Sequence, residues 1–235
     1  MIHREIEQLT PQWFEIKHGK IGGTRAGGLY IDSETLTLDI LSEVVESFDA
    51  DSEDDNYTSP AMMYGTDLEP QARVELGKYL GLHFQEAGWI QSDIPLLGIS
   101  PDGITANDEI QCEIKCPQRK KHVQNCLEPG IHKDYIAQCI HAFTVNPKLK
   151  KLYFLSYRPQ NDYVPMSVRE LTRDTVVSVG LTKKGTVWED RGKGLKEYVS
   201  TEPVLKTVQE WTEYSIVEAL KIEKNVKEYL EKFKF

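Results

Sequence analysis

The stretch from Gly98 to Pro117, GISPDGITANDEIQCEIKCP, constrains the fold more than any other part of the chain. Its end, CEIKC, alternates apolar and polar residues, which is typical of a β-strand with one face in a core. Residues two positions apart on a strand point to the same face. We therefore expect Glu113 and Lys115 to leave the strand side by side, while Ile114 points into the core.

A tight turn precedes this strand. Asp102 stands between a proline, which fixes φ, and a glycine, which permits the turn. Residues 104–106 and 109–116 are then predicted to form a hairpin with residues 107–108 at its tip. Such a hairpin would bring Asp102 back beside Glu113.

Two carboxylates and a lysine on one sheet face suit the hydrolysis of a phosphodiester. Hard divalent cations such as Mg²⁺ prefer oxygen ligands and keep several waters. Asp102 and Glu113 can hold the metal, while Lys115 polarises or orients the water that attacks phosphorus. The alternative for a Glu-x-Lys pair taken alone is an exposed cross-strand neighbourhood beside a turn aspartate. The SPDG turn and the hairpin-length spacer favour the metal site.

The order of these residues resembles a known motif. A proline and Asp102, followed by the EIK of residues 113–115, resembles the PD-(D/E)xK nuclease motif, and SPDG…EIKCP is similar to the phage lambda-type exonucleases of the YqaJ-like viral recombinase family. The resemblance extends from about residue 13 to about residue 159. It implies an α/β fold with a restriction-endonuclease-like core, in which a mixed central β-sheet is flanked by α-helices, and a C-terminal helix.

The resemblance also implies an activity and its partners. Members of this type digest one strand of linear duplex DNA from its 5′ end with Mg²⁺, or Mn²⁺, release mononucleotides and leave a 3′ single-stranded overhang for recombination. It further implies a toroidal homotrimer and a single-strand annealing protein as partner. The alternatives are a structure-specific or sequence-specific endonuclease that uses the same site, and a non-catalytic DNA-binding module.

The family roles can be carried onto individual positions of this chain. Glu69 in YGTDLE matches a G-x-x-x-E whose glutamate organises the metal and its water, and Gln138 in YIAQ matches a Y-x-x-Q whose glutamine reaches the active site. The implied catalytic set is Asp102, Glu113, Lys115, Glu69 and Gln138, with Asp102, Glu113 and the Ile114 carbonyl as metal ligands.

A glycine-rich turn at residues 20–24 opens a second short helix, where exposed N–H groups can bind phosphate. The family has an arginine and a serine here that hold the DNA 5′-phosphate. This chain has Lys17 and Thr24 instead, and losing the planar guanidinium removes bidentate recognition. Arg25 can compensate, and the preference for a 5′-phosphate is left open. The family serine before the proline implies that Ser100 contacts phosphate.

Arg119 and Lys120 belong to the densest basic run, residues 118–122, directly after the metal strand. This run either forms a solvated face or leads the DNA backbone toward the site. Asp93 is a further candidate, as a neighbour of a second metal. The net charge of −9 argues against a broad basic surface and against a pure DNA-binding role, since phosphate contacts come from lysine and arginine.

The remaining patterns predict one domain over residues 1–235, with a nuclease core at about 10–171 and a C-terminal helical part at about 203–235. Helices are expected at 10–18, at 34–48 with Leu38, Val44 and Val45 on its apolar face, at 59–80 with a kink or a break at Pro70, and at 131–145. Further strands are expected at 89–92, 96–100, 151–158 and 163–171. Residues 49–56 form an acidic loop, and 172–201 have no consistent pattern.

The cysteines and the hydropathy pattern bear on the compartment. The four cysteines show no C-x-x-C pairing, and we interpret them as small buried residues in a reducing cytoplasm. We find neither an N-terminal apolar segment nor an apolar run of membrane-spanning length. The sequence therefore predicts a cytoplasmic protein that does not associate with a membrane.

Overall fold

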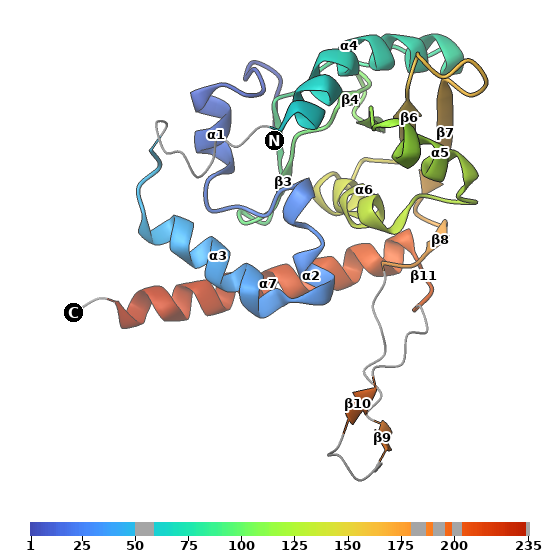
Figure 1. Ribbon diagram of the computed structural model, residues 1–235. Helices are drawn as coiled ribbons and strands as arrows, with labels where there is room; N and C mark the ends of the chain where they lie inside the picture. The colour runs from blue at the N-terminus through green and yellow to red at the C-terminus, as the bar shows by residue number, and fades with distance from the viewer. Residues whose placement is uncertain (50–58, 180–186, 190–195, 199–203, 234–235) are drawn as a thin grey trace.

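Figure 1 shows the computed structural model, which describes residues 1–49, 59–179, 187–189, 196–198 and 204–233. The acidic loop expected at 49–56 lies outside the described residues from residue 50 onward, as do parts of the stretch 172–201. Within the described residues, no helix is both long enough and apolar enough to cross a membrane.

The described helices and strands come in groups along the chain. The helical elements are α1 (Pro11–Lys17), η1 (Gly23–Arg25), α2 (Gly28–Ile31), α3 (Ser33–Val45), α4 (Pro60–Leu80), α5 (Arg119–Leu127), α6 (Lys133–Val145) and α7 (Val208–Lys232). The strands are β1 (Ile2–His3), β2 (Trp89–Gln91), β3 (Gly98–Ile99), β4 (Gly103–Ile104), β5 (Ile110–Lys115), β6 (Lys151–Tyr157), β7 (Met166–Thr172), β8 (Val176–Val177), β9 (Val187–Glu189), β10 (Lys196–Tyr198) and β11 (Lys206–Thr207). The helical elements α1, η1, α2, α3 and α4 come before β2–β5, and α5 and α6 come between β5 and β6.

The central sheet has the order β4-β5-β6-β7. Strand β5 pairs antiparallel with β4 and parallel with β6, and β6 pairs antiparallel with β7, so the sheet is mixed as predicted. A parallel pair needs a crossover connection, which α5 and α6 supply between β5 and β6. Strands β1, β2 and β3 form a separate antiparallel sheet.

Helices cover both faces of the central sheet (Figure 1). On one face Leu76 of α4 shares a core cluster with Ile114 and Leu155. On the other face Ile140 of α6 shares a larger cluster with Phe154. The two clusters take alternate residues of β6, as the two-residue period of a strand requires. Helix α7 packs across α6 and α3 as a further layer. The α/β core, the mixed sheet and the C-terminal helix are thus confirmed.

The structure differs from the sequence-based predictions at several helices. Helix α4 continues through Pro70, which is exposed, so that water can bond the carbonyl that the proline leaves without its usual partner. Helix α5 was not predicted, because its apolar residues are few. Leu38, Val44 and Val45, which were expected on the apolar face of α3, do not pack into the core, since their exposed fractions are 56%, 43% and 51%.

Candidate active site

The hairpin of β4 and β5 brings Asp102 beside the Glu-x-Lys strand, as predicted. Gly103 pairs with Cys112 in the ladder, and Asp108 at the tip has a left-handed φ of 65°. The Asp102 Oδ2 atom accepts a hydrogen bond of 2.5 Å from the Ile114 backbone N–H. This bond fixes the aspartate at the open edge of β5, beyond the end of β4.

Glu113 and Lys115 leave β5 together on the face opposite Ile114. The Lys115 ammonium forms a close ion pair with Glu113 Oε1. The Glu113 side chain is only 3% exposed, whereas 26% of the Lys115 side chain reaches solvent. Ile114 lies in the core under α4. The predicted geometry of this strand is therefore confirmed.

Glu69 joins these residues from α4 and brings Arg73 with it. The Arg73 Nη2 atom donates to Glu69 Oε1 at 3.1 Å, and its Nε donates to the Asp102 carbonyl oxygen at 2.5 Å. A second ion pair joins the Arg73 guanidinium to Glu86. Sequence reasoning missed Arg73, although its spacing of four residues from Glu69 on one helix was a readable signal.

Burial and mutual repulsion raise the pKa values of the carboxyl groups. Burial, reinforced by the charge of Asp102, raises the pKa of Glu113 to about 8 and that of Glu69 to about 7. Burial also raises the pKa of Asp102, although the Lys115 charge and the Ile114 N–H oppose this. For Lys115 the effect of burial is outweighed by Glu113 and Asp102, so its pKa is raised and it stays protonated.

The donor set fits a hard divalent cation that keeps most of its waters. Glu113 Oε1 is buried and, among the described residues, has no hydrogen bond besides its contact with Lys115. The N–H and C=O of a strand residue leave on the same side, so the Ile114 carbonyl points to the edge where its N–H meets Asp102. In the described part of the chain, no three His, Cys, Asp or Glu side chains form a finished metal cage. Mg²⁺ does not require one, because it binds through one or two carboxylates plus waters.

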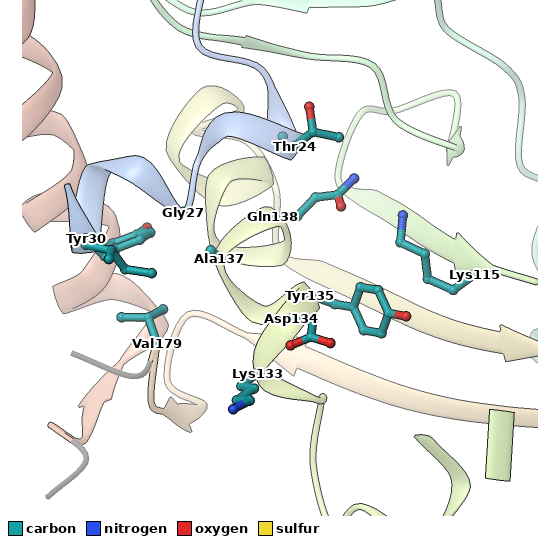
Figure 2. Close-up of a pocket in the computed structure, with 12 residues that line it drawn as sticks. Thr24, Gly27, Tyr30, Lys115, Lys133, Asp134, Tyr135, Ala137, Gln138 and Val179 are labelled. Carbon is teal, nitrogen blue, oxygen red and sulfur yellow. The ribbon is translucent and has the colours of Figure 1, made fainter. Parts of the chain in front are cut away.

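A cavity of about 710 Å³ opens beside Lys115 (Figure 2). Gln138 of α6 lines it, and its amide end extends toward Lys115, while Thr24 lies above it on η1. A Cβ at Gly23 would stand 3.0 Å from the Gln138 Cγ, so this glycine allows η1 to pack closely on α6. The structure therefore brings Gln138 and Thr24 to the same cavity as Lys115, together with Tyr135 and Lys133, which sequence reasoning did not select.

A smaller cavity of about 190 Å³ gathers the predicted phosphate-binding residues Lys17, Thr24 and Arg25. The Lys17 ammonium lies 3.4 Å from the centre of the Trp13 ring, and Arg25 is ion-paired with Glu43. Thr24 lines both cavities, so the two lie next to each other. Lys20, which the sequence analysis passed over, also lines the small cavity; burial lowers its pKa, and its ammonium donates to Gln91 at 2.8 Å.

The other predicted residues lie outside these cavities. The Ser100 hydroxyl donates to the Gly88 carbonyl and accepts from the Trp13 indole, each at 2.7 Å, so it ties α1 to the sheet. Arg119 and Lys120 are exposed in the first turn of α5. His122 of the same basic run is fully buried. Asp93 lines a separate cavity beside Arg4 and is not gathered with the carboxylates.

The raised pKa values predict how pH and Mg²⁺ affect stability. The folded state holds protons on Glu113 and Glu69 that the unfolded chain, with carboxyl pKa values near 4.5, has already released. The free energy of unfolding of the metal-free protein should therefore fall as pH rises from about 4.5, and the fall should level off above about 8. Mg²⁺ should raise Tm more at pH 8.5 than at pH 6, because it binds the ionised carboxylates. Thermal melts with Mg²⁺ or EDTA across this range would test this, and an Mg²⁺ effect independent of pH would contradict it.

Comparison with known proteins gives the family. The family model of the YqaJ-like viral recombinase domain matches residues 12–147. Among solved structures, the chain is similar to an alkaline exonuclease (LHK-Exo) from Laribacter hongkongensis, with a TM-score of 0.70, 19% identity and 96% of each chain covered. LHK-Exo in complex with dAMP gives a TM-score of 0.66 at 20% identity, over 95% of this chain and 97% of that one. No curated protein matches. The likeness at this identity concerns the fold, whereas the family match spans more than half of the chain, which therefore belongs to the YqaJ-like viral recombinase family.

Proposed function

We propose that the protein is a metal-dependent 5′→3′ exodeoxyribonuclease. It acts on the ends of linear double-stranded DNA, releases mononucleotides and leaves 3′ single-stranded overhangs for phage-type homologous recombination by strand annealing. The observation that supports this most is the convergence of Asp102, Glu113 and Lys115 at one edge of the sheet. The family membership of the chain and the alkaline exonuclease fold add support.

Each residue has a separate role in this proposal. Asp102, Glu113 and the Ile114 carbonyl would hold Mg²⁺, or Mn²⁺ in its place. A bound Mg²⁺ supplies charge neutralisation at the phosphate and a more acidic water. The protonated Lys115 donates a hydrogen bond to the attacking water and orients it, since its raised pKa makes it a poor base. Glu69, which Arg73 holds on α4, and Gln138, which lines the cavity beside Lys115, would support and position that water.

The end of the DNA strand would occupy the small cavity. Lys17, Thr24 and Arg25 offer an ammonium, a hydroxyl and a guanidinium there, which suit a terminal phosphate. Because Thr24 lines both cavities, a phosphate held there leaves the next phosphodiester near Lys115. In this proposal Ser100, Arg119 and Lys120 contact phosphates of the backbone. The dAMP complex of a protein with the same fold supports a mononucleotide product.

The family resemblance supports further proposals about assembly. We propose that the chain acts as a single domain in the cytoplasm, as a toroidal homotrimer, with a single-strand annealing protein as partner. Sedimentation of the purified protein would give the oligomeric state, and three copies would support a ring.

The decisive experiment uses linear duplex DNA labelled at one 5′ or one 3′ end, with Mg²⁺ or EDTA, beside a covalently closed circle. We expect Mg²⁺-dependent loss of the 5′ label as mononucleotide, slow loss of the 3′ label, and an intact circle. Cleavage of the circle would show that the protein is an endonuclease. If neither DNA is cut with Mg²⁺ or Mn²⁺, the remaining hypothesis is a DNA-binding module without catalytic activity.

A further inference from the structure

Arg73 and Lys115 are two cations in contact with the carboxylates, and the Arg73 side chain is the less exposed of the two. It is only 12% exposed, although it carries a permanent charge. It stands on α4 one turn after Glu69 and reaches three acceptors at once: Glu69 Oε1, Glu86 Oε1 and the carbonyl oxygen of Asp102. These acceptors belong to α4, to the loop before β2 and to the turn before β4.

These bonds hold Asp102 from two directions. Arg73 Nε fixes the peptide group that follows Asp102, while the Ile114 N–H fixes the carboxylate. Gly103 leaves room for this arrangement, because a Cβ there would lie 3.2 Å from the Arg73 Cδ and 2.7 Å from the Cys112 Sγ. Gly103 therefore permits the close approach of the Arg73 side chain as well as the turn.

The same guanidinium also holds Glu69. Glu69 comes from the helix on one face of the sheet, whereas Glu113 points to the other face, so no local geometry brings the two together. When they are ionised, as metal binding requires, the like charges of Glu69, Asp102 and Glu113 would drive these side chains apart. Arg73 opposes this repulsion with one charge and with hydrogen bonds to both Glu69 and the Asp102 peptide group.

We propose that Arg73 is a positioning residue for metal binding: its guanidinium fork fixes Glu69 and the Asp102 main chain, so that the site is formed before the cation arrives. This inference rests on the proposed function, because the cation is the one that the nuclease would use. Arginine is required because its planar fork reaches acceptors in three directions, whereas a lysine offers one charge at a single point. Residues that orient metal ligands typically contribute about 10- to 100-fold in metal affinity or activity.

The test measures Mn²⁺ binding to the full chain by calorimetry, without DNA, for the wild type, Arg73→Lys, Arg73→Gln and Glu86→Gln. We expect Arg73→Lys to weaken Mn²⁺ binding about tenfold and Arg73→Gln more, up to about a hundredfold. Glu86→Gln is the matched control, because it removes only the outer ion pair of a side chain that is 62% exposed. Its Mn²⁺ affinity should stay within about twofold of the wild type.

Circular dichroism and thermal melts establish which variants fold. If Arg73→Gln unfolds, Arg73→Lys decides, since it keeps the buried charge. Cleavage assays over a range of Mn²⁺ concentrations add a second measurement: the half-saturating concentration should rise in Arg73→Lys, with most of kcat recovered at high Mn²⁺. A folded Arg73→Lys variant with wild-type Mn²⁺ affinity would overturn the inference, as would a loss of kcat that no Mn²⁺ concentration restores.

The outcomes separate this inference from the proposed function. If the wild-type protein binds Mn²⁺ but cuts no DNA, the nuclease proposal is wrong. The Mn²⁺ affinities of the variants would still test whether Arg73 positions the metal site. If the wild-type protein cuts DNA and the Arg73 variants bind Mn²⁺ as the wild type does, only the positioning role of Arg73 is wrong. A wild type that binds no Mn²⁺ would overturn both.

Discussion

Replacing Glu113 with glutamine should lower the rate of Mg²⁺-dependent DNA cleavage by at least about a thousandfold, which corresponds to ~4 kcal/mol of activation free energy. The amide keeps the shape of the side chain but loses the negative charge that would hold the metal. Because this carboxyl is 3% exposed and its pKa is raised to about 8, the folded protein already tolerates its neutral form. We therefore expect the variant to fold with a Tm close to that of the wild type at pH 7.

Asp102→Asn should give the same loss of cleavage. An asparagine oxygen can still accept the hydrogen bond from the Ile114 N–H, so the turn should remain in place. Glu109→Gln is a matched control, because Glu109 lies on the same hairpin but pairs with Lys150 at the surface. Single-turnover cleavage of an end-labelled duplex, with circular dichroism as the test of folding, would measure all three. A cleavage rate within tenfold of the wild type for Glu113→Gln would remove this residue from the metal site.

The residues close together in sequence could be placed before the structure was known. The two-residue period of a strand sets Glu113 and Lys115 on one face and Ile114 on the other, and the SPDG turn with its short spacer returns Asp102 to the edge of β5. These relations depend only on backbone geometry. The mixed order of the sheet was available only through the resemblance to a family, since strand pairing between distant segments leaves no local signal.

Contacts between distant elements could not be read from the sequence. Arg73 reaches the carbonyl of Asp102 across 29 positions, and Lys20 meets Gln91 across 71. Amphipathic patterns were also insufficient for α3, because an apolar stripe shows where a helix can pack, whereas the area that its neighbours cover decides burial. Leu36, Ile40 and Leu41 are buried in the core cluster that α3 shares with α7, whereas Leu38 is exposed. A buried His122 inside a basic run escaped prediction for the same reason.

Replacing Lys115 with methionine should separate turnover from DNA binding. The ammonium lies at the cavity beside Gln138 and contacts the buried Glu113. It is therefore close to the place where the attacking water and the scissile phosphate would meet. Loss of a group that orients the nucleophile typically costs about 10²- to 10⁴-fold in rate. The affinity for DNA should change only by a few-fold, because one phosphate contact among many contributes little to binding.

The fold should survive this substitution for an electrostatic reason. Removing one partner of a buried ion pair leaves an uncompensated charge, which usually destabilises a protein by about 3–5 kcal/mol. Glu113 avoids this cost, because its pKa is already near 8 and rises further without Lys115, so that it takes up a proton at neutral pH. Methionine fills the volume of the aliphatic stem, and we expect a folded variant with little change in Tm.

Lys121→Met is the matched control for this substitution. Lys121 lies on α5, pairs with Asp134 and approaches the ring of Tyr135, as Lys115 does from β5, but it does not contact Glu113. Fluorescence anisotropy with Ca²⁺ in place of Mg²⁺ would measure DNA affinity, and single-turnover assays with Mg²⁺ would measure cleavage. For Lys115→Met we expect loss of cleavage with nearly unchanged affinity, and for Lys121→Met a small effect on both. An equal loss of affinity and cleavage in Lys115→Met would show that Lys115 binds DNA and does not orient the attacking water.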